Sequence, residues 1–241
     1  MISTIFAALA AFIVGVNKAG LKGVGVAAVA LMALVYGAKT STGVLLPLLV
    51  IGDIMAVIYY KRHVKWKYLS KFLPSMVIGV LLAVWLGKDV PEEVFKEWMA
   101  YVIIASVIIM VWRDLKKDVV FPKSWLFAGS IGIVAGITTM IGNLAGAFAN
   151  IFFLATKMPK NQIIGTSSWL FMIINSFKIP FHVMVWGTIN VQSLQSNLLH
   201  IPFVIVGFFL GLRIVSLFSE QGYRYFLLVA TALGALIILI R

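Results

Sequence analysis

The sequence predicts an all-α integral membrane protein that crosses the bilayer several times. Hydrophobic residues make up 62% of its 241 residues and charged residues 12%, about half the charged share of a typical soluble domain. Residues 24–38, 125–156 and 179–212 contain no Asp, Glu, Lys or Arg. A helix needs about 20 apolar residues to span the hydrocarbon core. Because the alternating pattern of a membrane β-strand is absent, helices are the remaining way to satisfy the backbone in lipid.

Six uninterrupted helices and two broken apolar regions are predicted along the chain. The helices are expected at residues 40–60, 69–87, 93–112, 162–181, 196–218 and 222–240. The broken regions, 2–36 and 125–156, each carry a run of Gly with Asn, Thr or Lys near the middle. Each is too long for one ordinary span and too short for two full ones, so we expect a re-entrant hairpin or two short spans. The apolar N-terminus lacks a basic start and a small-residue cleavage site, which predicts a segment of the mature protein.

The net charge of +12 lies mostly in short loops, which indicates membrane topology rather than nucleic-acid binding. The basic loop 61–67 is expected in the cytoplasm and the acidic loop 88–93 outside. If each broken region returns to the side on which it starts, Lys157, Lys160, Arg213 and Arg224 also lie inside. The positive-inside rule favours this topology.

The two halves of the chain resemble each other in the order of their Gly, Pro and polar residues. The matched pairs, at offsets of 121 to 128, are Gly15 with Gly136, Gly25 with Gly146, Gly43 with Gly165, Asp53 with Asn175, Pro74 with Pro202 and Gly79 with Gly207. They predict a first repeat at 1–115, a cytoplasmic linker at 116–124 and a second repeat at 125–241. Each repeat would be a broken or re-entrant helical hairpin plus three spanning helices. With the returning topology the two insert in opposite directions, the inverted-repeat architecture of secondary transporters.

The first break, between Gly15 and Gly25, has the composition of an anion site. Glycine lets the chain leave the helix and approach a ligand closely. The helix that restarts near Val24 presents free N–H groups and the positive end of its dipole. Lys18 and Lys22 are four residues apart and share a side where the chain is helical. The candidate substrate-binding residues here are Asn17, Lys18, Gly20, Lys22 and Gly23.

The second break supplies another helix start with neutral hydrogen-bond donors. Its candidate substrate-binding residues are Thr138, Thr139 and Asn143, joined by Ser167 and Ser168 at the start of the next helix.

Ionisable residues deep in the predicted spans are a further indication of function, because their burial is costly. They are Lys18, Lys22 and Lys178 against Asp53, so their balance is cationic and favours an anionic substrate. Lys178 is therefore a candidate substrate-binding residue. Asp53 and Asn175 are expected to orient these groups, or Asp53 to carry a coupling proton.

Each feature also has a purely structural interpretation, and the sequence leaves the choice open. The glycines can serve close helix packing. Lys18 and Lys22 can extend to the surface of one tilted span. Asp53 can be the structural partner of a lysine.

No enzyme, metal site or cofactor is expected. The absence of cysteine removes thiolate catalysis and Cys-based zinc sites, and His63, His182 and His200 lack the spacing of metal ligands. Residues 15–22 differ from a P-loop because the lysine comes one place late and no Ser or Thr follows it. Residues 23–25 lack the third glycine of a dinucleotide-binding loop.

These segments together resemble the sulfite exporter TauE/SafE family over nearly the whole chain. The matching positions are residues 17–23, the run 52–67 with its Gly-Asp-x-x-Ala-Val-x-Tyr-Tyr pattern, Pro74, Gly79, residues 165–168 and residues 175–178. One departure is Lys22, where many members carry a denser cluster of glycines.

The resemblance implies a secondary transporter that exports sulfite or an organosulfonate across a prokaryotic cell membrane by alternating access. Its expected partners are a small anionic substrate, the lipid bilayer and a coupling proton, with no nucleic acid. The alternatives are another small anion such as sulfate, thiosulfate or a carboxylate, an anion channel, and a membrane-embedded enzyme or assembly factor. The coupling ion, the direction of transport and the oligomeric state stay open.

Overall fold

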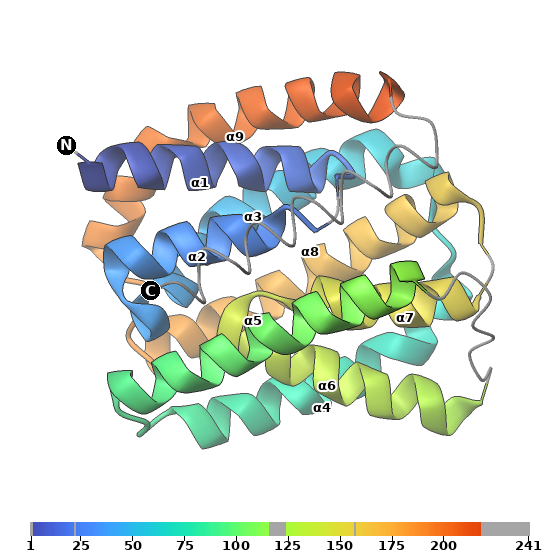
Figure 1. Ribbon diagram of the computed structural model, residues 1–241, viewed down its shortest axis with the longest axis horizontal. Helices are drawn as coiled ribbons and strands as arrows, with labels where there is room; N and C mark the ends of the chain where they lie inside the picture. The colour runs from blue at the N-terminus through green and yellow to red at the C-terminus, as the bar shows by residue number, and fades with distance from the viewer. Residues whose placement is uncertain (1, 22, 116–123, 157, 218–241) are drawn as a thin grey trace.

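The computed structural model describes residues 2–21, 23–115, 124–156 and 158–217, and every regular element in this part of the chain is helical. The helices run roughly along one axis of the molecule (Figure 1). In chain order they are α1 (Ile2–Lys18), α2 (Gly25–Tyr36), α3 (Ala38–Tyr60), the 3-10 turn η1 (Lys61–His63), α4 (Trp66–Gly87), α5 (Glu92–Leu115), α6 (Trp125–Gly142), α7 (Ala145–Ala155), α8 (Lys160–Met184) and α9 (Val191–Leu217). The prediction of an all-helical chain is confirmed for these residues. The helix predicted at 222–240 and most of the predicted linker lie outside them.

The outer surface of the molecule suits contact with lipid. Three helical stretches within the described residues are long and apolar enough to cross a membrane: Ala38–His63, Trp66–Gly87 and Val191–Ile214. Trp85 and Phe209, on two of these helices, are more than half exposed. A surface so rich in apolar side chains would be a liability in water but is favourable in a bilayer.

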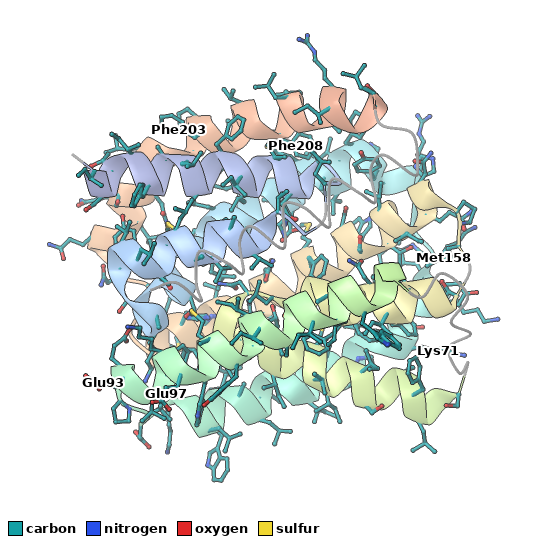
Figure 2. All side chains as sticks on the ribbon, viewed as in Figure 1. Lys71, Glu93, Glu97, Met158, Phe203 and Phe208 are labelled. Carbon is teal, nitrogen blue, oxygen red and sulfur yellow. The ribbon has the colours of Figure 1, made fainter. Side chains whose placement is uncertain are left out.

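Charged side chains lie toward the two ends of the bundle. Glu93 and Glu97 of α5 lie at one end, whereas Lys71 of α4 lies toward the other (Figure 2). This separation of acidic and basic side chains agrees with the predicted topology, in which the acidic loop 88–93 and the basic loop 61–67 lie on opposite sides of the membrane.

Both broken regions fold as two helices that turn back on each other (Figure 1). In the first, the chain leaves α1 through Gly20 and Gly23, whose φ angles of 126° and 109° are strained for any residue with a side chain. In the second, Asn143 adopts the left-handed conformation with φ 55°, and its N–H bonds to the Thr139 carbonyl at 3.0 Å to close α6. The helices of the two pairs have 17 and 12 residues, and 18 and 11 residues, so only the first of each pair approaches the length of a full span.

The packing of the helices crosses between the two halves of the chain. α1 packs along α9, α6 packs along α4, and α3 and α8 contact each other. Glycines make the first two contacts possible: a Cβ at Gly15 would overlap the Val204 carbonyl oxygen, and one at Gly136 would overlap that of Met76. Small residues let helices approach closely in a membrane, where lipid gives no hydrophobic force to drive helices together. The packing interpretation of these glycines therefore holds at both positions.

We expect Gly136→Ala to destabilise the protein by about 1–3 kcal/mol, because the new Cβ would force α6 away from α4. Gly129→Ala is the matched control, since it makes the same change on the same helix where a Cβ meets nothing within 4 Å. The free energy of unfolding in detergent micelles measures both. Equal effects of the two substitutions would contradict the close α4–α6 contact.

Candidate functional site

A cavity of about 80 Å³ lies between the two breaks and the middle of α3 and α8. One buried water needs about 10–15 Å³ of such space, so the cavity has room for several waters or a small ion. Its polar lining residues are Asn17, Lys18, Asp53, Ser106, Thr139, Asn143, Asn150, Ser167, Ser168 and Asn175. Residues far apart in the sequence, from both halves of the chain, therefore form one polar site inside an apolar bundle.

An ion pair between α1 and α3 forms one wall of the cavity. The Nζ atom of Lys18, the last residue of α1, lies 2.6 Å from Oδ1 of Asp53, and Oδ2 of Asp53 accepts from Nδ2 of Asn175 at 2.7 Å. Gly52 allows this contact, because a Cβ there would press on the Lys18 side chain. Asp53 is fully buried, and each of its carboxylate oxygens has a partner. The pair contributes no net charge to the site.

Lys178 of α8 does not line the cavity itself but lies behind the part of its wall that Thr139 and Asn143 form. Its fully buried ammonium donates to the Thr139 carbonyl at 2.9 Å, to Thr139 Oγ1 at 3.1 Å and to Asn143 Oδ1 at 2.6 Å. These three neutral acceptors use all three of its donors. No carboxylate of the described residues lies within 4.0 Å of this nitrogen. Buried charges are normally paired with an opposite charge, so the ammonium form of Lys178 would give the site one positive charge that no described carboxylate within 4.0 Å compensates.

The starts of two helices line the same cavity. Gly25 and Val26 of α2 and Gly146 and Ala147 of α7 are lining residues. The first turn of a helix carries N–H groups without acceptors in that helix and the positive end of its dipole. Both breaks therefore add to the positive potential that Lys178 creates.

Neutral donors complete the lining. The Thr139 hydroxyl accepts from Lys178, which leaves its own hydrogen for another acceptor. The Asn17 amide lies over the start of α2, where a Cβ at Gly25 would approach Asn17 Nδ2 to 2.9 Å. Asn150 lies one turn after Gly146 on α7. These groups can donate hydrogen bonds to an oxyanion.

The structure brings most of the residues predicted from the sequence to this one cavity. Those that line it are Asn17, Lys18, Gly20, Gly23, Asp53, Thr139, Asn143, Ser167, Ser168 and Asn175. Lys178 and Thr138 do not: Lys178 acts through Thr139 and Asn143, and the Thr138 hydroxyl donates to the Ala135 carbonyl. Lys22 lies outside the described residues.

Two polar lining residues, Ser106 and Asn150, are not among the predicted ones. Each stands among apolar neighbours in its helix, which is the signal in the sequence that could have identified it. The predicted residue Ser168 lines the cavity but donates its hydroxyl hydrogen to the Ile164 carbonyl at 2.8 Å. Its oxygen therefore faces the site mainly as an acceptor.

No group of three or more His, Cys, Asp or Glu residues that could hold a metal ion occurs in the described part of the chain. The titratable residues of the site are Lys18, Asp53 and Lys178. Lys18 and Asp53 form an ion pair, and Lys178 is hydrogen-bonded to neutral protein groups. This arrangement can bind an anion by charge and hydrogen bonds.

We expect a cysteine at position 146 to react with a water-soluble methanethiosulfonate reagent, because the space around its Cβ is open and the residue lines the cavity. The chain has no cysteine of its own, so the signal is specific. Ala149→Cys is the control, since Ala149 lies on the same helix, is fully buried and does not line the cavity. Mass spectrometry of the labelled variants measures both rates. Failure of Gly146→Cys to react faster than Ala149→Cys would contradict a hydrated cavity.

Comparison with known proteins identifies the chain. Neither the search of curated proteins nor that of solved structures gives a significant match. A protein-family model described as "Sulfite exporter TauE/SafE" matches residues 7–238, which is nearly the whole chain. With its all-helical architecture and its buried polar cavity, the chain belongs to the sulfite exporter TauE/SafE family.

Proposed function

We propose that this protein is a secondary transporter that exports sulfite or an organosulfonate across a prokaryotic cell membrane, and that the anion binds in the cavity between the two breaks. Membership of the TauE/SafE family supports membrane transport of a sulfur-containing anion. The contacts of the site support a negative charge on the substrate.

The observation that carries this proposal is that Lys178 contacts three neutral acceptors and no carboxylate of the described residues. Lys18 and Asp53 cancel each other, so the described side chains of the site sum to one positive charge. A bound anion would act as the missing counter-ion. It would approach Lys178 through Thr139 and Asn143, with the starts of α2 and α7 on its other sides. A cationic substrate would meet repulsion from the Lys178 ammonium and from the positive ends of α2 and α7.

The glycine contacts support two inverted repeats, with the boundaries 1–115 and 125–241. A Cβ at Gly79 would overlap the Ile133 carbonyl oxygen, just as one at Gly207 would overlap that of Phe12. The offset that relates Gly79 to Gly207 also relates Met76 to Val204, and the offset that relates Gly15 to Gly136 also relates Phe12 to Ile133. These four glycine contacts, two between α1 and α9 and two between α4 and α6, are therefore related by one exchange of the halves.

The directions of the helices support the same architecture. α1 begins at one end of the bundle and α6, its counterpart, begins at the opposite end (Figure 1). In such folds the substrate site lies at the interface of the repeats, and rocking of one repeat against the other exposes the site to alternate sides. The contact of α3 with α8, one helix from each half of the chain, beside the cavity supports this arrangement.

We expect Asn143→Asp to lower the affinity for sulfite at least about tenfold. The new carboxylate would pair with Lys178 and become its permanent counter-ion, and two charges about 4 Å apart interact by roughly 4 kcal/mol at an effective dielectric of about 20. Asp also tolerates the left-handed conformation of this position. Binding to purified protein and saturable uptake into proteoliposomes both measure the effect.

Asn161→Asp is the matched control, because it adds the same charge at an exposed position near the start of α8. Wild-type affinity in Asn143→Asp would contradict the counter-ion role. Competition by sulfate, thiosulfate, taurine-like sulfonates and carboxylates identifies the preferred anion, and counterflow exchange distinguishes a transporter from a channel.

A further inference from the structure

The ion pair of Lys18 and Asp53 blocks the one cation that lines the cavity among the described residues. Lys18 Nζ lies 2.6 Å from the carboxylate, and the Lys18 and Asp53 side chains are 9% and 1% exposed. An anion in the cavity competes with this carboxylate for Lys18. Two negative groups on one buried ammonium repel each other, so one of them has to give up its charge or its position.

We infer that Asp53 takes up one proton when a divalent anion binds, and that release of the ion pair turns Lys18 toward the anion. This inference rests on the proposed function and adds the coupling of the same site to protons. The proton passes from water to Oδ1 of Asp53, Lys18 keeps its charge, and no covalent bond of the substrate changes. Asn175 Nδ2 still donates to Oδ2, now the carbonyl oxygen of the acid, while the new O–H can donate to the anion.

The charge balance of the site supports this stoichiometry. With Lys18, Lys178 and Asp53 all ionised, the empty site carries one net positive charge. Sulfite as a dianion would leave it negative by one charge inside the bundle, where an unpaired charge is costly. One proton on Asp53 makes the occupied site neutral. A monovalent sulfonate reaches neutrality without any proton.

Asp53 is the one carboxylate among the described residues that line the cavity, so it is the group that can accept the proton. From the helices packed on α3, Lys18 of α1 and Lys178 of α8 are the charged residues of the site, and His182 lies one turn beyond Lys178 on α8. α2, α5, α6 and α7 give only neutral side chains to the cavity wall, and α9 gives none of the described lining residues.

The second half of the chain offers no equivalent acceptor. The repeat relation places Thr139 on Lys18 and Asn175 on Asp53, so neutral residues stand where the first half has its ion pair. Among the described residues the site therefore has one carboxylate to protonate, and the proposed coupling is one proton for each dianion.

The test is titration of sulfite into wild type and Asp53→Asn at mildly alkaline pH, in buffers of different ionisation enthalpy, so that the protons taken up per anion are counted. Wild type is expected to take up about one proton and to lose affinity about tenfold for each unit rise in pH. Asp53→Asn is expected to bind sulfite with no proton uptake and with little dependence on pH. Asp89→Asn is the matched control, because Asp89 is 85% exposed and outside the site.

Proton uptake that persists in Asp53→Asn would overturn the inference, because the proton would then travel on the anion as bisulfite. Difference infrared spectra of wild type give a reading that needs no variant: a carboxylic-acid band should appear on sulfite addition, and its absence would equally overturn the inference. Both failures leave the transporter proposal intact. Absence of sulfite binding to folded wild type would instead overturn the proposed function, and the coupling with it.

Discussion

The site depends on the contacts of one buried ammonium group, that of Lys178. Its hydrogen bonds to the Thr139 carbonyl and the Asn143 side chain fix the break at which α6 ends and α7 begins. A hydrogen bond to a charged group contributes about 1.5–3 kcal/mol, whereas burial of an ion costs several kcal/mol. Three neutral acceptors can retain such a charge without cancelling it. The same lysine thus holds the second break in shape and leaves the cavity attractive to an anion.

The helix packing brings this lysine and the Lys18–Asp53 ion pair to the wall of one cavity. Glycines let α1 lie against α9 and α6 against α4, so that each broken helix is supported by a helix from the other half. α3 and α8 then meet in the middle, where the Asn175 amide reaches Asp53. Fixed helices that cross at their glycines and a central polar site suit a protein in which two halves move as bodies around a bound ion.

Much of this fold could be predicted because its causes are local. Apolar length predicts each helix, and runs of Gly with Asn predict the two breaks, since only such residues adopt the left-handed turns found at Gly20, Gly23 and Asn143. The helix ends were less predictable. α8 extends from Lys160 to Met184 where residues 162–181 were expected, because polar and aromatic residues at a membrane surface continue a helix as readily as they end it.

The side of the helix on which each polar residue lies could not be predicted. In a helix that is apolar all round, hydrophobic periodicity does not fix which residues face a cavity. Ser106 and Asn150 therefore line the cavity without having been predicted, whereas Lys178 and Thr138, predicted from their residue type, do not line it. The charge balance of the site could not be predicted from the sequence either, because the sequence does not show which lysine pairs with Asp53. The structure shows that this lysine is Lys18.

Selenite offers the most direct test of the central claim, that an anion in the cavity serves as counter-ion to Lys178. It has the shape and charge of sulfite, and its selenium atom gives an anomalous X-ray signal. A crystal of the protein grown with selenite should show an anomalous peak between Thr139, Asn17 and the starts of α2 and α7, and this peak should disappear in Asn143→Asp. Occupancy of the cavity by water alone, with selenite bound elsewhere or not at all, would contradict the account.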